Sequence, residues 1–401
     1  MPVAALSRVA AAVASAGGVS RPEIWKRLEK VPEFRAGNLF YPLPCLLAIG
    51  LCALSAAGHD GIEAIAQWVD KASEIELARL RVPRDPFTRR LRRPSASTIR
   101  RALTRVDPNA LVAAVLAPDT QRRDEADTET ASAAEASTAQ APVVGAVALD
   151  GKSCRGARRG DGTRVHLVGA VTHKDGLLVG HVEVDRKSNE TTAFQPLLAP
   201  MALTDTVVTF DALHSVRANL EWLVTAKKAH YLAVIKANQP SLFAQLKALP
   251  WADLPVADVT RDHGHGRDET RTVKATTVAH LDFPHAAQAI RIHRWRRETG
   301  KAPSRETVYA VTDLTFRQAG GALLNDLARS HWHVENKAHH TRDVSFREDH
   351  STVRTGHAPM NLATLRSAVI NALRRAGYAF IPPGRRDHTT PTAALDLHGF
   401  P

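Results

Sequence analysis

Apolar and polar positions follow two different patterns along the chain, and these patterns divide it into two parts. Across residues 20–117 apolar residues recur every three or four positions, as Ile62, Ile65 and Val69 do, which is the spacing of amphipathic helices. From residue 143 onward, short apolar runs end at Gly or Asp, which is the pattern of strands. The sequence therefore predicts a helical N-terminal domain at 20–117 and an α/β domain at 143–380.

Three segments show neither pattern. Residues 1–19 are rich in Ala without a strong apolar core, so we expect a flexible leader rather than a signal peptide. Residues 118–142 are polar and locally acidic, which is typical of a linker. Residues 381–401 are rich in Pro, Arg and Thr, which predicts a loose tail.

One uncharged run, LFYPLPCLLAIGLCALSAAG, raises the question of a membrane span. After Pro44 its helical part covers only about 14 residues, short of the roughly 20 that cross a bilayer. We predict a buried core helix with Cys45 and Cys52 on one face. These cysteines and Cys154 form no CxxC pair, which disfavours a disulfide framework and a cysteine zinc site and suits a reducing cytoplasm.

The α/β domain is predicted to contain three strands, a helix, a strand, a helix and a strand, in that order. A mainly β insertion with basic outward positions is expected at about 250–320, and a further helix begins at Leu323. This order is that of a ribonuclease-H-like domain, in which helices flank a mixed five-stranded sheet. The predicted fold class is therefore α/β, preceded by a helical domain.

The formal net charge of +12 over 401 residues suggests a polyanionic partner, most often nucleic acid, with ordinary solubility charge as the alternative. One helix of the N-terminal domain carries part of this charge. With Ser97 or Thr98 as its cap, it turns apolar residues inward and presents Arg100, Arg101 and Arg105 outward. This pattern fits a helix-turn-helix DNA-binding element and a solvated basic helix equally well.

The densest group of chemically active residues is RSHWHVENKAHHTRDVSFREDH, which begins at Arg329. A zinc hydrolase would need HExxH, with two histidines on one helical face around a glutamate. That motif is missing, and His331 and His339 lie eight residues apart, too far to share one ion easily. A zinc site is therefore disfavoured, and the acid among the histidines, Glu335, becomes the residue of interest.

Three carboxylates stand where hard metal ions are expected. Asp150 and Asp211 end strongly apolar strands, and Glu335 lies on the later helix. A ribonuclease-H-like domain needs acids at these places: on strand one, after strand four and on a helix beyond strand five. Such carboxylates suit two Mg²⁺ or Mn²⁺ ions, which polarise the attacking and leaving oxygens of an in-line phosphoryl displacement. Strand and helix capping is the ordinary alternative.

An ordered series of motifs resembles the H-repeat-associated group of insertion-sequence DDE transposases over residues 143–376. The motifs are ALDGKSCRG, HLVGAVTH, VDRKSNET, VVTFDALHS, HYLAVIKANQPSL, GHGRDETR and HWHVENKAHHTRDVSFREDHS. FYPLPCLLAIGLCALSAAG and PSASTIRRAL are similar to the helical leader domain of that group. The resemblance implies a DDE triad of Asp150, Asp211 and Glu335. It also implies metal-dependent cutting of transposon ends and joining of the freed 3′-hydroxyl to target DNA.

The same resemblance implies double-stranded DNA partners, namely the terminal inverted repeats of the element and the target DNA. It further implies a homodimer or larger assembly on DNA ends, in the cytoplasm near the nucleoid. The chain departs from the wider insertion-sequence pattern four residues before the glutamate, at His331, and seven after it, at Arg342. A degenerate or domesticated relative that binds DNA without cutting it is the alternative function.

Residues expected to contact DNA surround the triad and the basic elements. On the catalytic helix, His331, His339 and Arg342 share one face with Glu335 and suit phosphate. The others each have an ordinary surface or capping role as the alternative. They lie beside Asp150, at the start of the first helix, after the fifth strand, on the insertion and on the N-terminal basic helix: Lys152, Lys187, Lys236, Asn238, Arg267, Arg100, Arg101 and Arg105.

Further expectations concern neighbours of the triad. The segment with Glu190 starts the first helix of the α/β domain, where free N–H groups bind phosphate or a capping side chain satisfies them. Trp332 is expected in the core rather than as a platform for a base. Asp343, Glu348 and Asp349 are expected to pair with arginines rather than to bind metal.

Overall fold

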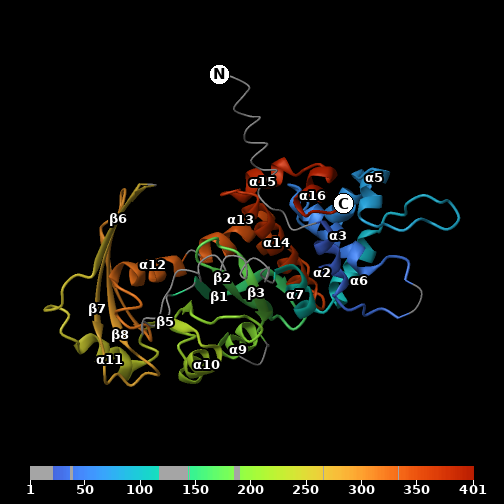
Figure 1. Ribbon diagram of the computed structural model, residues 1–401. Coiled ribbons are helices and arrows are strands. Elements are labelled where there is room, and N and C mark those ends of the chain that lie inside the picture. Colours follow the sequence, from blue (N-terminus) through green and yellow to red (C-terminus); the bar gives the residue numbers. More distant parts are fainter. Residues whose placement is uncertain are drawn as a thin grey trace, which may run out of the picture.

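A computed structural model shows a large mixed sheet with helices packed against it (Figure 1). It describes residues 21–36, 39–116, 143, 145–184, 190–264, 266–332 and 334–401. The predicted leader at 1–19, the predicted linker at 118–142 and Lys187 therefore lie outside the described residues. None of the helices in the described ranges has both the length and the apolar character that a membrane span requires.

Within the described residues, nine strands form one sheet in the order β3-β2-β1-β4-β5-β9-β8-β7-β6. β1 pairs in parallel with β4, and β4 with β5, whereas the other neighbouring pairs are antiparallel. The strands are β1 (Gly145–Arg158), β2 (Arg164–Thr172), β3 (Leu178–Glu183), β4 (Thr206–Phe210), β5 (His230–Ile235), β6 (Asp258–Gly264), β7 (Arg267–Thr277), β8 (Gln288–Glu298) and β9 (Ser304–Thr312).

The insertion is part of the main sheet, which corrects the expectation of a five-stranded sheet with a separate β insertion. β9 pairs with β5 from Leu232↔Thr312 to Ile235↔Tyr309, so the insertion strands extend the five strands that the sequence predicts. The sequence pattern misses β6, because its residues, DVTRDHG, include a single large apolar side chain. Pairing with β7, rather than its own pattern, makes this segment a strand.

The parallel pairing of β1 with β4 fixes the level of two acids. Ala148 lies opposite Thr209 at the last paired position. Asp150 and Asp211 each follow two residues later and therefore lie at the same level. β1 continues along β2 to Arg158, so Asp150 lies within a strand. The sequence predicted that Asp150 ends its strand, and that prediction is wrong. What ends near Asp150 is the pairing with β4.

Different helices pack against the two faces of the sheet. They are the short turn η2 (Glu190–Ala193), α9 (Phe194–Leu198), α10 (Arg217–Lys227), α11 (Pro240–Ala248), α12 (Gly321–His331), the π-helical turn η3 (Glu335–His340), α13 (Thr341–Phe346), the turn η4 (Glu348–His350) and α14 (Ala358–Arg375). Val208 and Phe210 of β4 pack with α9, α10 and α11, whereas Val207 packs with α12. By the two-residue period of a strand, Thr209 and Asp211 belong to the α12 side.

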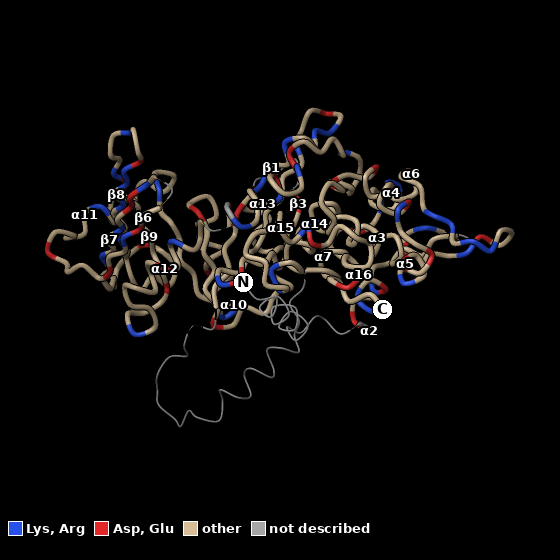
Figure 2. The backbone as a smooth tube through the Cα atoms, turned by 90° about the horizontal axis from the view of Figure 1, so that it is seen from above, with Lys and Arg blue, Asp and Glu red and all other residues tan. Residues whose placement is uncertain are grey.

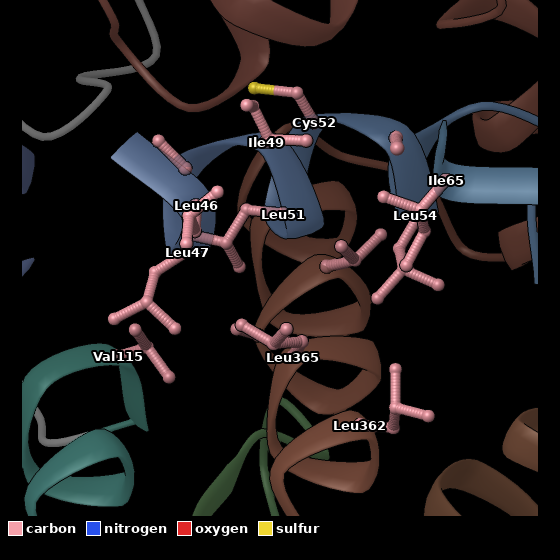
Figure 3. Close-up of a cluster of buried hydrophobic side chains, with 14 of the residues drawn as sticks. Leu46, Leu47, Ile49, Leu51, Cys52, Leu54, Ile65, Val115, Leu362 and Leu365 are labelled. Carbon is pink, nitrogen blue, oxygen red and sulfur yellow. The ribbon is translucent and has the colours of Figure 1, made fainter. Parts of the chain in front are cut away.

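The described residues from 21 to 116, which we call the N-terminal body, are mainly helical. Its helices are α2 (Arg21–Glu29), α3 (Leu43–Ser55), α4 (Ile62–Lys71), α5 (Glu74–Arg79), α6 (Ala96–Arg105) and α7 (Pro108–Leu116). The uncharged run forms α3, which is buried along nearly its whole length and holds Cys45 and Cys52 as buried free thiols. Figure 3 shows α3 above Leu365 of α14 and Val115 of α7. A Cβ at Gly50 would lie 2.9 Å from Leu365 Cδ1, so a glycine permits this close approach.

α14 joins the N-terminal body to the sheet. Most of its residues are buried, and it packs on α3, α6 and α7 as well as on β2 and β3. One cluster of buried side chains therefore runs from the N-terminal helices through α14 to Ala148, Val171 and Leu178 of the sheet. Each fully buried Leu, Ile or Val in this cluster contributes about 1.5–3 kcal/mol. The two predicted domains share a core instead of being separate bodies.

The tail predicted to be loose is helical and packed. α15 (Ile381–Asp387) and α16 (Pro391–Leu397) follow α14, and the ring of buried Phe400 lies 5.0 Å from that of Trp25. Arg385 donates to the carbonyls of Leu54 at 3.1 Å and Ala56 at 2.7 Å, at the end of α3. The prolines that suggested a loose segment stand in the first turns of these helices, where a missing N–H costs little.

The basic helix α6 has a different cap and a different neighbour from those predicted. The N–H of Thr98 donates to Ser95 Oγ at 3.3 Å, so Ser95 is the cap. The three arginines are exposed, as expected: Arg100, Arg101 and Arg105. Residues 80–95 separate α5 from α6, which is far longer than the short turn of a helix-turn-helix. The segment between α5 and α6 is therefore not the turn of a helix-turn-helix.

Glu348 lies in a buried ion network that connects these parts. Its carboxylate lies 3.2 Å from Arg342 Nε and 3.2 Å from Arg366 Nη1, and each of the three residues is at most 3% exposed. Arg366 also donates to the carbonyl of Asp60 at 2.9 Å. Burial acts to raise the pKa of Glu348, but the two arginines and Lys152 outweigh it and hold that pKa below its usual value. The predicted pairing with arginines is confirmed, and one partner comes from α14.

Replacing Glu348 by Ala should lower the free energy of unfolding by about 3–5 kcal/mol, because two buried guanidinium groups lose their partner. Urea denaturation at pH 7 measures this change. Glu63→Ala is the control, since the pair of Glu63 with Arg100 is exposed at 67% and 54% and contributes about 0–1 kcal/mol. Equal effects of the two substitutions would contradict a role for the network.

Candidate active site

The candidate site lies where the parallel pairing of β1 and β4 ends. Asp150 and Asp211 lie there at one level. Asp150 is 3.4 Å from His339 of η3, and Asp211 is close enough to His331 of α12 to influence its pKa. The fold thus brings the two strand acids close to the segment that carries Glu335.

Asp150 lies among other negative charges. Its Oδ1 accepts the N–H of the next residue at 2.8 Å, and its Oδ2 lies 3.4 Å from His339 Nδ1. Burial raises the pKa of Asp150 to about 6, and three neighbouring carboxylates add to the rise: Asp211, Glu190 and Glu335. Ionising Asp150 in the folded protein therefore costs free energy that a nearby cation would return.

Asp211 begins the loop after β4, next to a buried histidine. Its Oδ1 accepts the N–H of Leu213 at 2.9 Å. His331 Nδ1 lies 3.1 Å from Thr209 Oγ1, and burial lowers the pKa of His331 to about 4 despite the charge of Asp211. At neutral pH His331 is therefore uncharged and buried against the strand, so it does not present the positive charge to phosphate that the sequence suggested.

Glu335 is exposed and begins the π-helical turn between α12 and α13. The sequence predicted one continuous α-helix with four polar residues on a single face. The wider π turn interrupts that face: Glu335 reaches solvent, whereas Arg342 is buried and His339 is 12% exposed. Single π turns inside helices occur frequently at functional sites.

Glu190 is a fourth acid at this edge, which the sequence did not reveal. Its carboxylate occupies the space beside β1, since a Cβ on Gly151 would lie 2.6 Å from its oxygens. Its Oε1 is 2.6 Å from His166 Nε2, and its Oε2 is 3.3 Å from His214 Nε2. The hydrogen bonds from His166 and then His214 lower the pKa of Glu190 to about 2. In the sequence, this packing is reflected by Gly151, because a larger residue there would clash with the Glu190 carboxylate.

The acids do not form a preassembled metal cluster. Among the residues that the structure describes, no group of three or more His, Cys, Asp or Glu side chains is placed to hold a metal ion. The donor chemistry nevertheless fits a hard divalent cation, which prefers carboxylate oxygens. Asp211 and Glu335 are close enough to Asp150 for their charges to raise its pKa. The three acids therefore have the right chemistry for such a cation, but their spacing in this structure does not form a metal site.

Two cations that were expected at DNA form internal ion pairs. Lys152 is 7% exposed, and its Nζ lies 2.7 Å from Asp343 and 3.6 Å from Asp349. Arg342 is 3% exposed and pairs with Glu348. Neither offers its charge to solvent, contrary to the prediction of phosphate contacts. The ion pairs expected for the three acids do form: Lys152 takes the place of an arginine for Asp343, whereas Asp349 contacts both Lys152 and Arg155.

Lys236 and Asn238 follow β5 and belong to the same edge. Lys236 is exposed and lies near enough to His331 to help lower its pKa. Asn238 Nδ2 donates to the carbonyl of Ala212 at 2.8 Å, which ties its loop to the one that begins at Asp211. Lys236 thus remains an exposed cation beside the acids, whereas Asn238 holds two loops together.

The insertion meets the end of α12 through an aromatic ring. Trp332 was expected in the core, but it is 37% exposed. The guanidinium groups of Arg271 and Arg294 lie 4.9 Å and 4.7 Å from the centre of its ring, in cation–π contacts. Arg267 lies further along β7, exposed and 4.0 Å from Glu269. Arg267 is therefore open to solvent, as predicted, but outside the cluster of acids.

Two family models match this chain. Residues 144–372 match the model described as "Transposase DDE domain", and residues 25–117 match the one described as "DDE_Tnp_1-associated". The first match covers more than half of the chain and runs from β1 into α14. The second covers most of the N-terminal helical body.

The chain is similar to several bacterial proteins. "Putative transposase YncI" of Escherichia coli O157:H7 is 28% identical in an alignment of 255 residues that covers 57% of this chain and 61% of that protein. "H repeat-associated putative transposase YhhI" of Escherichia coli strain K12 is 28% identical in an alignment of 248 residues that covers 57% of this chain and 63% of that protein. The chain thus spans less than two thirds of the length of these relatives. A solved structure described as "Cryo-EM structure of piggyBac transposase synaptic complex with hairpin DNA (SNHP)" has 11% identity and a TM-score of 0.39, over 94% of this chain and 76% of that one.

Replacing Glu190 by Gln should lower the free energy of unfolding at pH 7 by about 2 kcal/mol, because two histidines lose a charged acceptor. The folded-state pKa of Glu190, about 2, lies below the value of about 4.3 for an unfolded Glu. The carboxylate therefore stabilises the fold above about pH 4.3, and this contribution is lost as the pH falls toward about 2. Urea denaturation of wild type and E190Q should show a difference that shrinks between about pH 5 and pH 3.

Glu221→Gln is the matched control, since Glu221 also contacts a histidine, His285, at 3.0 Å but is 57% exposed. It should change the free energy of unfolding little at any pH. A stability difference between wild type and E190Q that stays constant down to about pH 3 would rule out the histidine contacts as its cause.

Proposed function

The chain belongs to the transposase DDE domain family, as its sequence predicted, and from this premise we propose that it is a DNA transposase. It cuts the ends of its own mobile element and joins the freed 3′-hydroxyl to target DNA, with divalent cations at Asp150, Asp211 and Glu335. Both steps are in-line displacements at phosphorus. The site must therefore accept phosphate oxygens and support a developing negative charge.

The sheet supports a ribonuclease-H-like core for this chemistry. Strands β3-β2-β1-β4-β5 lie in the order expected of that fold, and β1, β4 and β5 are parallel. In α/β sheets the reacting groups gather at the carboxyl ends of parallel strands. The insertion of β6–β9 falls between β5 and α12, so it lengthens the sheet without displacing that edge.

The observation that carries the proposal is the level position of Asp150 and Asp211 beside an exposed Glu335. Burial raises the pKa of Asp150 to about 6, and the neighbouring carboxylates add to the rise, so its ionised form is a cost to the folded protein without a cation. Perturbed pKa values cluster at functional sites, and Asp150 is a perturbed carboxylate at a sheet edge. A divalent cation would draw the three acids together and remove the repulsion.

Each side chain has a distinct role in this proposal. Asp150 and Asp211 supply carboxylate oxygens from the sheet, and Glu335 supplies them from the helix. Divalent cations, when bound, polarise the attacking and leaving oxygens. Burial holds the pKa of His339 well below its usual value, so His339 orients Asp150 as a neutral ring and adds no positive charge that would repel the cation. Lys236 is exposed beside the acids and holds a phosphate of the incoming strand.

A DNA-binding protein without catalytic activity is the alternative. The presence of all three acids in the sequence argues against it, because a protein that had lost the chemistry would not need them. Transfer also requires two DNA ends at once, so we propose that at least two copies of the chain assemble on DNA. A cleavage assay separates the catalytic from the non-catalytic protein.

Substituting Asn for Asp150 or Asp211, or Gln for Glu335, should lower the rate of Mg²⁺-dependent cleavage roughly 10³-fold or more. A lost carboxylate ligand removes several kcal/mol of transition-state stabilisation. The substrate is a labelled duplex made from the DNA that flanks the coding sequence, and products are resolved on a denaturing gel. Affinity for the same duplex, measured by fluorescence anisotropy in EDTA, should not fall.

Asp326→Asn is the control, since Asp326 is exposed on α12, the helix before Glu335, and has no role in the proposal. It should cut at the wild-type rate. Cleavage by the wild type in excess EDTA would contradict a metal-dependent site. Tight binding without nicking, in both Mg²⁺ and Mn²⁺, would favour the non-catalytic protein.

Cation binding should also be measurable without DNA, as a rise in melting temperature with Mn²⁺. The pKa of Asp150, about 6, exceeds the unfolded value of about 3.9, so its ionisation destabilises the fold as the pH rises. The Mn²⁺-induced rise should therefore be larger at about pH 7.5 than at about pH 5.5, where protons compete for the carboxylate. D150N should raise the melting temperature of the metal-free protein and remove the Mn²⁺ effect. An undiminished Mn²⁺ effect in D150N would exclude Asp150 as a ligand.

A further inference from the structure

A hairpin between α5 and α6 projects from the N-terminal body, away from the sheet (Figure 1). We name residues 81–93 the basic hairpin. Buried side chains fix its base: Leu80, Val82 and Leu91 are each at most 5% exposed. Arg84 and Leu91 pair across it in an antiparallel bridge. The segment is therefore an ordered projection with a packed base.

Asp85 fixes the tip of the basic hairpin. Its Oδ1 accepts the backbone N–H groups of Phe87 at 3.0 Å and Thr88 at 2.9 Å. Its own N–H donates to the carbonyl of Arg90 at 2.8 Å, and its carbonyl accepts the N–H of Arg89 at 2.9 Å. The N–H donors hold the pKa of Asp85 below its usual value, so the turn keeps its charged acceptor at neutral pH.

The tip combines an exposed aromatic ring with unpaired cations. Phe87 is 93% exposed. Residues 84–93 contain five arginines and one acid. Arg89 and Arg90 are exposed, and within the described part of the chain neither has an ion-pair partner. Figure 2 shows Lys and Arg along the arms of this projection. The preformed turn thus holds a large ring and unpaired cations together, in positions where a partner can reach them.

We propose that the basic hairpin binds duplex DNA in the minor groove, with Arg89 and Arg90 on the backbone and Phe87 inserted between base pairs. The proposal rests on the proposed transposase function, which provides duplex DNA as the partner. Minor-groove proteins combine cations with an apolar wedge that unstacks a base step and bends the duplex. Cations without the ring would bind without bending, and the ring without cations would not select a polyanion.

The test uses the full-length protein and end-labelled duplexes made from the DNA that flanks the coding sequence. Fluorescence anisotropy gives affinity over a range of salt concentrations, and energy transfer between the duplex ends gives bending. R89A/R90A should reduce the slope of log affinity against log salt by about two, because two phosphate contacts are lost. F87A should keep the wild-type slope and lose most of the bend.

Asp85→Ala separates the shape of the basic hairpin from its charge. The substitution removes a negative charge, so a purely electrostatic patch would bind DNA more tightly. It also removes the acceptor of two backbone N–H groups, so a preformed wedge would lose its geometry. We expect D85A to bend DNA less than the wild type, with Phe87 and all five arginines still present.

Phe316→Ala and Arg317→Ala are matched controls, because both residues are exposed in the loop before α12. They should leave affinity, salt slope and bending unchanged. The substituted side chains of the hairpin tip are exposed, so melting curves of F87A and R89A/R90A should match the wild type. Bending defects in these folded variants then report on the DNA contact itself.

Wild-type bending by F87A would overturn the hairpin proposal, and so would a wild-type salt slope for R89A/R90A. A change of oligomeric state with unchanged DNA binding, seen by light scattering, would also overturn it and place a second copy of the chain on the hairpin. If the wild type cuts DNA while hairpin variants bend it normally, the hairpin proposal fails alone. If the wild type neither binds nor cuts any duplex, the transposase function fails and the hairpin proposal fails with it.

Discussion

The parallel register of β1 with β4 is the constraint on which the candidate site depends. It sets Asp150 level with Asp211, and a slip of one residue would turn one of them to the opposite face of the sheet. Thr209 helps to fix this register, because its hydroxyl lies 2.9 Å from His173 Nε2 and 3.1 Å from His331 Nδ1. A slip would bury that hydroxyl without partners, at a cost of about 1–3 kcal/mol. The same contacts that hold the strand thus hold the acids.

Glu335 depends on buried contacts on both sides of its own segment. Before it, His331 is buried against the sheet through Thr209. After it, Arg342 is buried against Glu348, which also pairs with α14 through Arg366. These anchors leave the π turn between them free to expose one carboxylate. The positions four before and seven after Glu335, which resembled phosphate contacts in sequence, therefore act first on the position of the helix.

The sequence predicted what local pattern controls, and it missed what distant partners decide. Strand and helix periodicity, together with the motif series, was sufficient to pick out the segments that carry Asp150, Asp211 and Glu335. The role of Glu190 depends on His166 and His214, which come from a neighbouring strand and a later loop, so no spacing along the chain could show it. Likewise, the tail appeared loose from its composition, yet tertiary packing around buried groups such as Phe400 orders it.

The distribution of charge shows why net charge alone describes this protein poorly. Several cations are buried in internal pairs, including Lys152 and Arg366, so neighbouring carboxylates offset their charge and it does not attract a polyanion. The acids at the sheet edge repel phosphate as long as no cation is bound. In the proposed function, binding energy for a duplex would then come mainly from exposed cations remote from the acids, such as those of the basic hairpin, while Lys236 holds phosphate beside them. A chain organised in this way would hold DNA at a distance from the chemistry and bring phosphate to the acids only once divalent cations have neutralised them.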